Sequence, residues 1–130
     1  MRKVLIVEDN PDMREILALQ MQQLEFTVVL AENGEEGVQK ATAEKPDLVL
    51  MDILMPVMSG IEAARIIRSS FETREIPILA ITAVFRESEL KSCLEEGCSD
   101  YLVKPYTLQE LKLKVEALVP STVEGASETE

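Results

Sequence analysis

The chain has 130 residues, 46% of them hydrophobic, and its 24 acidic and 13 basic residues give a net charge of −11 at pH 7. This length suits one domain with its own core, and the negative charge repels nucleic acid backbones, so we expect no nucleic acid partner. Two cysteines without histidine exclude a disulfide framework and a closed zinc site. We find no apolar run long enough for a membrane helix or signal peptide, and we expect a cytoplasmic protein that binds no membrane.

Short apolar runs alternate with amphipathic segments five times along the chain. Three of these runs are hydrophobic at successive positions, which is typical of strands covered on both faces of a parallel sheet. The predicted strands span Lys3 to Val7, Phe26 to Ala31, Asp47 to Met51, Pro77 to Thr82 and Asp100 to Val103. Because right-handed crossovers join parallel strands, this rhythm predicts a three-layer α/β fold with a doubly wound, five-stranded parallel sheet.

The segments between and after these strands carry helix signals. Asn10 caps the first helix, and Thr107 with Glu110 forms a capping box at the start of the fifth. The fourth helix is predicted over Ser88 to Glu96, with Gly97 ending it. The predicted inward-facing side chains are Met13, Ile16, Leu17, Met21 and Leu24; Val38 and Ala41; Ile61, Ala64 and Ile67 or Arg68; Leu90 and Leu94; and Leu108, Leu111, Val115 and Leu118.

The composition changes near Pro120, where the polar, acidic sequence STVEGASETE follows. It has too few large apolar side chains to offset the entropy of ordering. We therefore predict a folded domain over residues 1–119 and a disordered acidic tail over residues 120–130. A tail that is ordered and docked on the domain is the alternative.

Charged and hydroxyl residues gather where an open parallel sheet binds its ligands, beyond the carboxyl ends of the strands. Glu8 and Asp9 follow the first strand, Asp52 follows the third, Thr82 ends the fourth and Lys104 follows the fifth. Taken singly, most are explained as solvated loop or strand residues. Asp52 is flanked by apolar residues, where a carboxylate is costly to desolvate. The convergence of all five on one edge predicts a site.

The predicted acid cluster implies a cation. Carboxylates about 4 Å apart repel by about 4 kcal/mol per pair at an effective dielectric constant near 20. Oxygen ligands without histidine or thiolate select a hard ion, and few protein ligands with room for water favour Mg²⁺ over Ca²⁺. One such ion with Lys104 nearly neutralises the acids and can receive a phosphate. Phosphoryl transfer to an aspartate is the chemistry that these residues favour.

Four stretches in order resemble the receiver domain of bacterial two-component response regulators, over Lys3 to Leu118. They are VLIVEDN from Val4, LVLMDILMPVMSG from Leu48, ILAITA from Ile78 and DYLVKPY from Asp100. The resemblance implies a flavodoxin-like (βα)5 sheet in strand order 2-1-3-4-5. It also implies a phosphorelay protein that takes a phosphoryl group from a histidine of a sensor kinase or phosphotransfer protein, and that is not an enzyme with a separate substrate.

The resemblance also implies roles for single residues. The implied phosphoacceptor is Asp52, and Mg²⁺, the one cofactor implied, would bind Glu8, Asp9, Asp52 and the backbone carbonyl of Leu54. The implied phosphate-binding residues are Thr82, Ala83 and Lys104. Thr82 and Tyr101 would form the switch, and Pro105 would follow a cis peptide bond.

An aspartyl phosphate carries about two negative charges in place of one, which Thr82 and Lys104 can approach by short moves. When Thr82 moves, Tyr101 can fill the space that it leaves. A partner protein can then distinguish the two arrangements of Thr82 and Tyr101. By analogy, the face read by a downstream protein is the fourth helix, fifth strand and fifth helix, including Phe85, Leu90 and Tyr106. We expect a monomer, with dimerisation on activation as the alternative.

Several other interpretations bear on function. A phosphohydrolase of the haloacid dehalogenase type would need a second aspartate where Leu54 stands, and a flavin carrier would need small residues in the loop EDNPDM. Leu54 and Val84 replace polar residues that help water attack the acylphosphate in the family, so we hypothesise slow loss of phosphate. Cys93 and Cys98 are expected to be free, partly buried thiols, with a redox pair as the alternative.

The role of the chain as a whole has two open alternatives. It could be a pseudo-receiver that acts as a scaffold without phosphorylation, although all the charged site residues are present. It could also be a receiver excised from a hybrid histidine kinase or a larger regulator. The methionine directly before the first strand and the acidic tail favour a small stand-alone protein.

Overall fold

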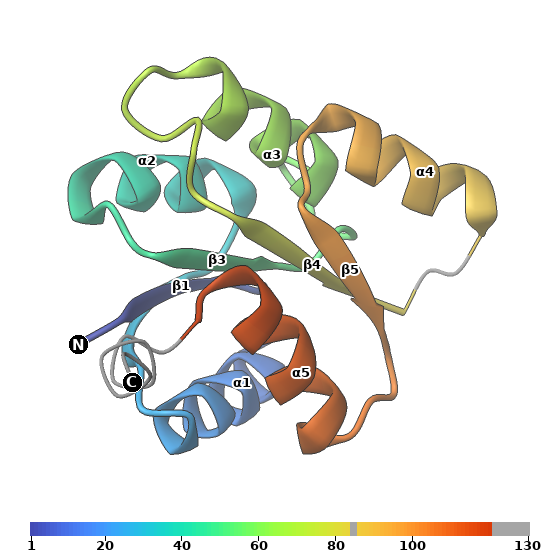
Figure 1. Cartoon of the computed structure of the whole chain (residues 1–130). Helices are drawn as coiled ribbons and strands as arrows, with labels where there is room; N and C mark the ends of the chain where they lie inside the picture. Colours follow the sequence, from blue (N-terminus) through green and yellow to red (C-terminus); the bar gives the residue numbers. More distant parts are fainter. Residues whose placement is uncertain (84–85, 121–130) are drawn as a thin grey trace, which may run out of the picture.

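The structure is a computed structural model that describes residues 1–83 and 86–120, in which five strands alternate with five helices (Figure 1). All strand pairs are parallel, and the strand order is β2-β1-β3-β4-β5, which confirms the predicted fold class. The strands are β1 (Lys3–Val7), β2 (Thr27–Ala31), β3 (Leu48–Met51), β4 (Ile78–Thr82) and β5 (Asp100–Val103). The helices are α1 (Pro11–Gln23), α2 (Gly34–Glu44), α3 (Gly60–Ser69), α4 (Glu87–Glu96) and α5 (Leu108–Leu118).

Three strands begin one residue later than predicted, each for a local reason. The Phe26 N–H donates to Met21 O at 3.0 Å, so Phe26 belongs to the turn that ends α1. The Lys3 N–H donates to the Asp47 side chain at 2.8 Å and not to its carbonyl oxygen, so the ladder of β1 with β3 begins one residue later, at the Val4–Leu48 pair. Pro77 has no N–H group to give to a ladder.

The sheet lies between two helical layers, with α1 and α5 on one face and α2, α3 and α4 on the other (Figure 1). Side chains of β1 alternate between the faces. Val4 and Ile6 join the hydrophobic cluster beside α1 and α5, whereas Leu5 and Val7 join the cluster beside the other helices. Both faces are therefore buried, which explains the continuous apolar runs in the sequence.

The predicted helix signals at Asn10, Gly97 and Thr107 are confirmed. Asn10 Oδ1 accepts the Met13 N–H at 3.0 Å, and Thr107 forms the predicted capping box. Gly97 ends α4 with a φ of 136°, a conformation that suits glycine. None of the described helices is long and apolar enough to cross a membrane.

Three side chains predicted to face inward are instead exposed: Ile16 by 45%, Leu94 by 41% and Leu108 by 40%. A helix lying on a sheet buries only a narrow stripe, so neighbours of that stripe stay in solvent. In α1 the stripe is Leu17 and Met21, which places Ile16 on its flank. In α4 the only fully buried side chain is that of Cys93, next in sequence to Leu94. Leu108 is the first residue of α5.

Some predictions fall on residues outside the part of the chain that the structure describes. These are Val84, Phe85 and residues 121–130 of the predicted tail.

Candidate functional site

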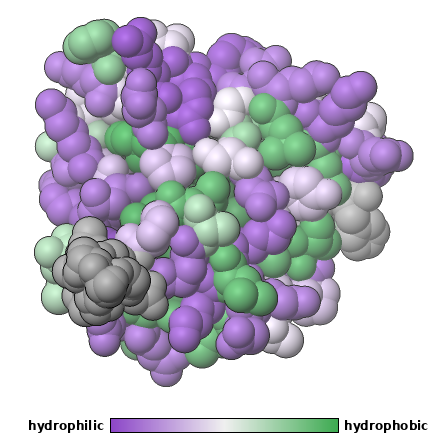
Figure 2. Space-filling view, viewed as in Figure 1, coloured by the Kyte–Doolittle hydropathy of each residue, from purple (hydrophilic) through white to green (hydrophobic). Residues whose placement is uncertain are grey.

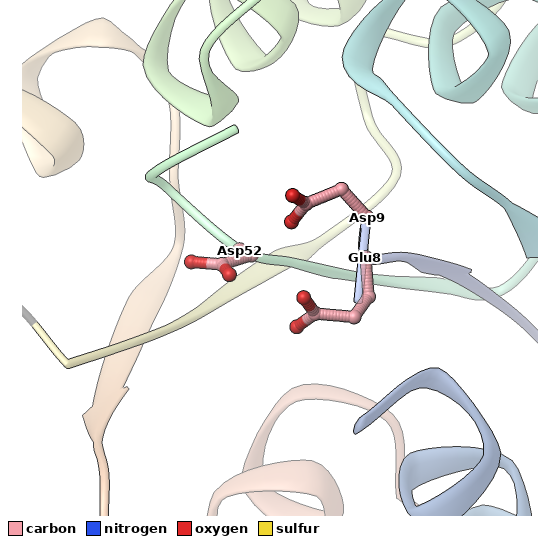
Figure 3. Close-up of side chains that lie close together, drawn as sticks. All are labelled: Glu8, Asp9 and Asp52. Atoms are coloured by element: carbon pink, nitrogen blue, oxygen red, sulfur yellow. The ribbon is translucent and has the colours of Figure 1, made fainter. Parts of the chain in front are cut away.

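The predicted acidic cluster forms at the carboxyl edge of the sheet. In β1 and β3, Val7 and Met51 are partners in the ladder, so the residues that follow, Glu8 and Asp52, leave the sheet side by side. Glu8, Asp9 and Asp52 each offer a carboxylate oxygen, and these oxygens lie within 4.8 Å of one another (Figure 3). Sheet register therefore places three negative charges at one point.

Lys104 contributes the positive charge of the cluster. Its Nζ lies 3.6 Å from Glu8 Oε1 and 3.7 Å from Asp52 Oδ2. The Lys104 N–H donates to Thr82 O at 2.8 Å, which fixes the chain at the end of β4 and β5. The Lys104–Pro105 peptide bond is cis, as the resemblance implies. Thr82 itself is buried, at 0% exposure.

Burial dominates the electrostatics of the two inner acids. Desolvation raises the pKa of Glu8, which is 2% exposed, although the Asn10 N–H donated to its carboxylate at 3.1 Å opposes the shift. Desolvation also raises the pKa of Asp52, opposed mainly by the Lys104 ammonium group. Asp9 is exposed. Among the described residues, the Lys104 ammonium group is the only ion-pair partner of Glu8 and Asp52, and Asp9 adds a third acid beside them, so negative charge is left to neutralise.

The donor set fits a hard divalent cation. The three carboxylates provide oxygen ligands only and converge on one point. Asp9 is exposed, so an ion can reach the cluster from solvent. Asp52 Oδ1 accepts the Leu54 N–H at 3.1 Å, which orients the carboxylate and brings the next loop residues to the cluster. Oxygen ligands of this kind suit Mg²⁺ or Ca²⁺. The cluster could therefore hold such an ion.

The predicted switch residues lie on the neighbouring strands. Tyr101 is half-buried on β5 and pairs with Ala80 of β4, two residues before Thr82. The Lys114 ammonium group lies 5.7 Å from the centroid of the Tyr101 ring. Ala83 follows Thr82 and is exposed.

Two residues that support the cluster were not identified from the sequence. Gly60 at the start of α3 lies against the backbone of Asp52, where a Cβ atom would collide with the Asp52 carbonyl oxygen. Arg14 of α1 donates to the Glu8 carbonyl oxygen at 2.8 Å. The Ser59-Gly60 pair at the start of α3 is a sequence signal for close packing, whereas nothing in the sequence pattern singles out Arg14.

A groove with a volume of about 490 Å³ opens beside the cluster, between α1 and the segment after β5. The Tyr106 hydroxyl donates to Gln20 Oε1 at 3.1 Å and bridges these two elements. Burial raises the pKa of Tyr106 to about 12. The groove is lined by Met13, Ile16, Gln20, Ala83, Lys104, Pro105 and Tyr106. Ile16, on the exposed flank of α1, is therefore one of the apolar side chains of this groove.

Comparison with known proteins identifies the family. Residues 4–116 match the model of the response regulator receiver domain. The chain belongs to the response regulator receiver family. Receiver domains are signalling modules of two-component phosphorelays, so the resemblance seen in the sequence is confirmed over nearly all of the described chain.

Receiver domains of two architectural kinds are among the relatives. Hybrid signal transduction histidine kinase G of Dictyostelium discoideum is 42% identical over 94% of the chain, which corresponds to 4% of that protein. Response regulator MprA of Mycolicibacterium vanbaalenii is 35% identical over 98% of the chain, or 55% of that protein. The chain therefore spans about half of one relative and a small part of the other.

Solved receiver structures have the same architecture. The receiver domain of sensor histidine kinase PA1611 from Pseudomonas aeruginosa, solved with a magnesium ion in its active-site cleft, has a TM-score of 0.86 at 33% identity. It matches 92% of this chain and 98% of that one. Vibrio cholerae chemotaxis protein CheY4 also gives 0.86, at 28% identity, over 92% and 99% of the two chains.

Proposed function

We propose that this receiver domain accepts a phosphoryl group on Asp52 from a phosphohistidine of a sensor kinase or phosphotransfer protein. The observation that carries the proposal is the juxtaposition of the Asp52 carboxylate with two further acids and Lys104, 3.7 Å away. An Asp52 oxygen attacks phosphorus, a P–O bond forms as the donor's P–N bond breaks, and the released imidazole nitrogen takes a proton. Lys104 is positioned to pair with a phosphoryl oxygen.

The proposed cofactor is Mg²⁺, held by Glu8, Asp9, Asp52 and the Leu54 carbonyl. When bound, the ion supplies positive charge that offsets the acids and the incoming phosphoryl group. Support comes from the oxygen-only donor set in this chain and from the magnesium ion in the related Pseudomonas receiver. Both point to a hard cation as the partner of these carboxylates.

Intact mass after incubation with acetyl phosphate tests the proposal. Wild-type protein with MgCl₂ should gain about 80 Da, and Asp52→Asn should gain nothing. Omitting Mg²⁺ should abolish the gain in wild type. Asp12→Asn removes an exposed acid from the start of α1 and serves as a charge-matched control that keeps the gain. A wild-type protein labelled neither by acetyl phosphate nor by a kinase would favour the scaffold alternative.

The groove beside Lys104 is the proposed docking surface of the phosphodonor. A donor imidazole must reach Asp52 from outside, and the apolar flank of α1 at Ile16 lies next to that route. An apolar helix surface that carries the phosphohistidine fits this groove. Ile16→Asp should slow labelling by a protein donor while leaving labelling by acetyl phosphate unchanged, because the small donor needs no docking surface.

The proposed output is a change in the face formed by α4, β5 and α5. Figure 2 shows hydrophobic side chains between α4 and α5, over β5, and Leu113 is 62% exposed on α5. Thr82, Ala83 and Lys104 would meet the phosphoryl group, and Tyr101 would follow Thr82 inward. The face that binds a downstream protein would include Leu90 and Tyr106. A monomer at rest is the expected state.

Tyrosine fluorescence can follow this switch, because the chain has two tyrosines and no tryptophan. In Tyr106→Phe the only remaining tyrosine is Tyr101, so its emission should change on phosphorylation. The same variant carrying Thr82→Ala should show phosphorylation by mass with a smaller change in emission. An emission that does not respond to phosphorylation would contradict the role of Tyr101.

Slow loss of phosphate is the proposed consequence of Leu54, which is 57% exposed beside Asp52. An apolar side chain there cannot orient an attacking water. A radiolabel with a half-life of minutes or longer is expected, and Leu54→Asn should shorten it.

The free thiols of Cys93 and Cys98 support a reducing, cytoplasmic location.

A further inference from the structure

The carboxyl-terminal end of α4 brings two cysteine side chains together. The Cys98 N–H donates to Cys93 O at 3.0 Å, and the Gly97 N–H donates to Leu94 O at 3.4 Å. With Gly97 at a φ of 136°, these two bonds make a Schellman motif. In this motif the side chains three residues before the last helical position and two residues after it come into contact. Here those positions are Cys93 and Cys98.

Both thiols are free and lie in one hydrophobic cluster, with Cys93 at 0% and Cys98 at 6% exposure. They are more buried than the sequence predicted. A hydrogen bond from the Cys98 thiol lowers the pKa of Cys93 and raises that of Cys98. The Arg68 guanidinium lies beside Cys98, held by Ile76 O at 2.7 Å and Ser99 Oγ at 3.3 Å. The neighbouring S–H donor favours the thiolate form of Cys93, whereas the Arg68 charge acts on Cys98, whose pKa is raised despite it.

Helix α4 is the element whose local opening would expose the pair. Its cap residue, Arg86, makes no side-chain hydrogen bond to the helix, and Cys93 is its only fully buried side chain. Leu94 is 41% exposed. Helices with few buried contacts open at low free-energy cost compared with global unfolding.

We propose that Cys93 and Cys98 form a reversible thiol modification site that a peroxide converts into a disulfide. The Cys93 thiolate attacks a peroxide oxygen and the O–O bond breaks, giving a sulfenic acid, and the expelled hydroxide takes the proton that the Cys93 thiol released and leaves as water. The Cys98 sulfur then attacks Cys93 Sγ, and a second water leaves as the S–S bond forms. Two thiols are oxidised and one hydrogen peroxide is reduced to two waters. The product links the end of α4 to a residue two positions before β5.

Thiol titration and intact mass after treatment with hydrogen peroxide test this site independently of phosphorylation. The folded protein should lose both titratable thiols and about 2 Da, and dithiothreitol should restore both. Cys93→Ala and Cys98→Ala should each lose the 2 Da change while keeping wild-type circular dichroism. Two thiols that survive peroxide, or a mass gain from oxidation of one cysteine without a cross-link, would overturn the proposal.

The equilibrium in glutathione redox buffers is a second test, which does not depend on access to the thiols. If the helix end pre-positions the sulfurs, their effective concentration should be on the order of tenfold higher in folded protein than in urea. Gly97→Ala disrupts the motif, because an added Cβ would press on Arg68 Cγ, and should reduce that ratio. Equal effective concentrations in folded and unfolded wild type would show that the contact is simple packing.

Discussion

At the scale of single residues, Asp52 is held where its charge is unfavourable without a bound cation. Its side chain is 11% exposed and shares the cluster with Glu8 and Asp9. We predict that Asp52→Asn increases the free energy of unfolding in EDTA by about 1 kcal/mol, because a neutral amide removes like-charge repulsion and desolvation cost. Urea unfolding measures this, and Asp12→Asn, outside the cluster, should give no increase.

The pH dependence of that difference follows from the raised pKa of Asp52. A carboxyl group whose pKa is higher in the folded than in the unfolded state stabilises the fold while it is protonated, and this contribution is lost as the pH rises through the folded-state pKa. The advantage of Asp52→Asn over wild type should therefore be small near about pH 4 and grow toward about pH 7. An advantage that shrinks with rising pH would contradict the assigned direction.

Val57 carries backbone strain in the loop after Asp52. It is 81% exposed and has a φ of 70°, a region that costs a β-branched residue roughly 1–2 kcal/mol. Val57→Gly should remove that strain. Because glycine also raises the entropy of the unfolded chain, the net stabilisation should be at most about 1 kcal/mol. Ala43→Gly, at an exposed position of α2, is the control and should destabilise the protein. Thermal unfolding of both variants distinguishes strain from a general effect of glycine.

At the scale of elements, the contact of α3 with the end of β3 sets the position of Asp52. A Cβ on Gly60 would collide with the Asp52 carbonyl oxygen, so Gly60→Ala must push the helix or the strand end away. We predict a loss of about 2 kcal/mol in stability and slower labelling by acetyl phosphate. Ser59→Ala, which removes only the cap bond to the Glu62 N–H, should cost about 1 kcal/mol and leave labelling unchanged. If Gly60→Ala and Ser59→Ala were labelled at the same rate, the contact of Gly60 with Asp52 would have no role in positioning the phosphorylation site.

The elements could be predicted from the sequence because strong local signals and the tertiary structure agree. Apolar runs mark the strands, and Asn10 and Thr107 mark helix starts through bonds within a few residues. The inward face of α4 was predicted incorrectly because Leu94 is more hydrophobic than Cys93, and only the placement of the helix on the sheet shows which one is buried. Such packing depends on residues far apart in the chain.

The acid cluster was predictable for a related reason. In a parallel sheet, the residues after each strand share one edge, so Glu8, Asp52 and Lys104 meet by topology. The support given by Gly60 and Arg14 was not predictable, since it rests on a close backbone approach and on one hydrogen bond to a carbonyl oxygen. Neither leaves a distinctive pattern in the sequence.

At the scale of the whole molecule, a net charge of −11 means that any salt screens repulsion, so specific Mg²⁺ binding must be separated from screening. A ligand that binds only the folded state adds about 1.4 kcal/mol at ten times its dissociation constant, which raises the melting temperature by several degrees in a domain of this size. MgCl₂ should therefore raise the melting temperature by clearly more than KCl does at equal ionic strength. In Asp9→Asn, which weakens the cluster without removing Asp52, the two salts should act nearly alike. Equal effects of both salts on wild type would mean that the acids hold no ion, and that the proposed phosphoryl transfer lacks its cofactor.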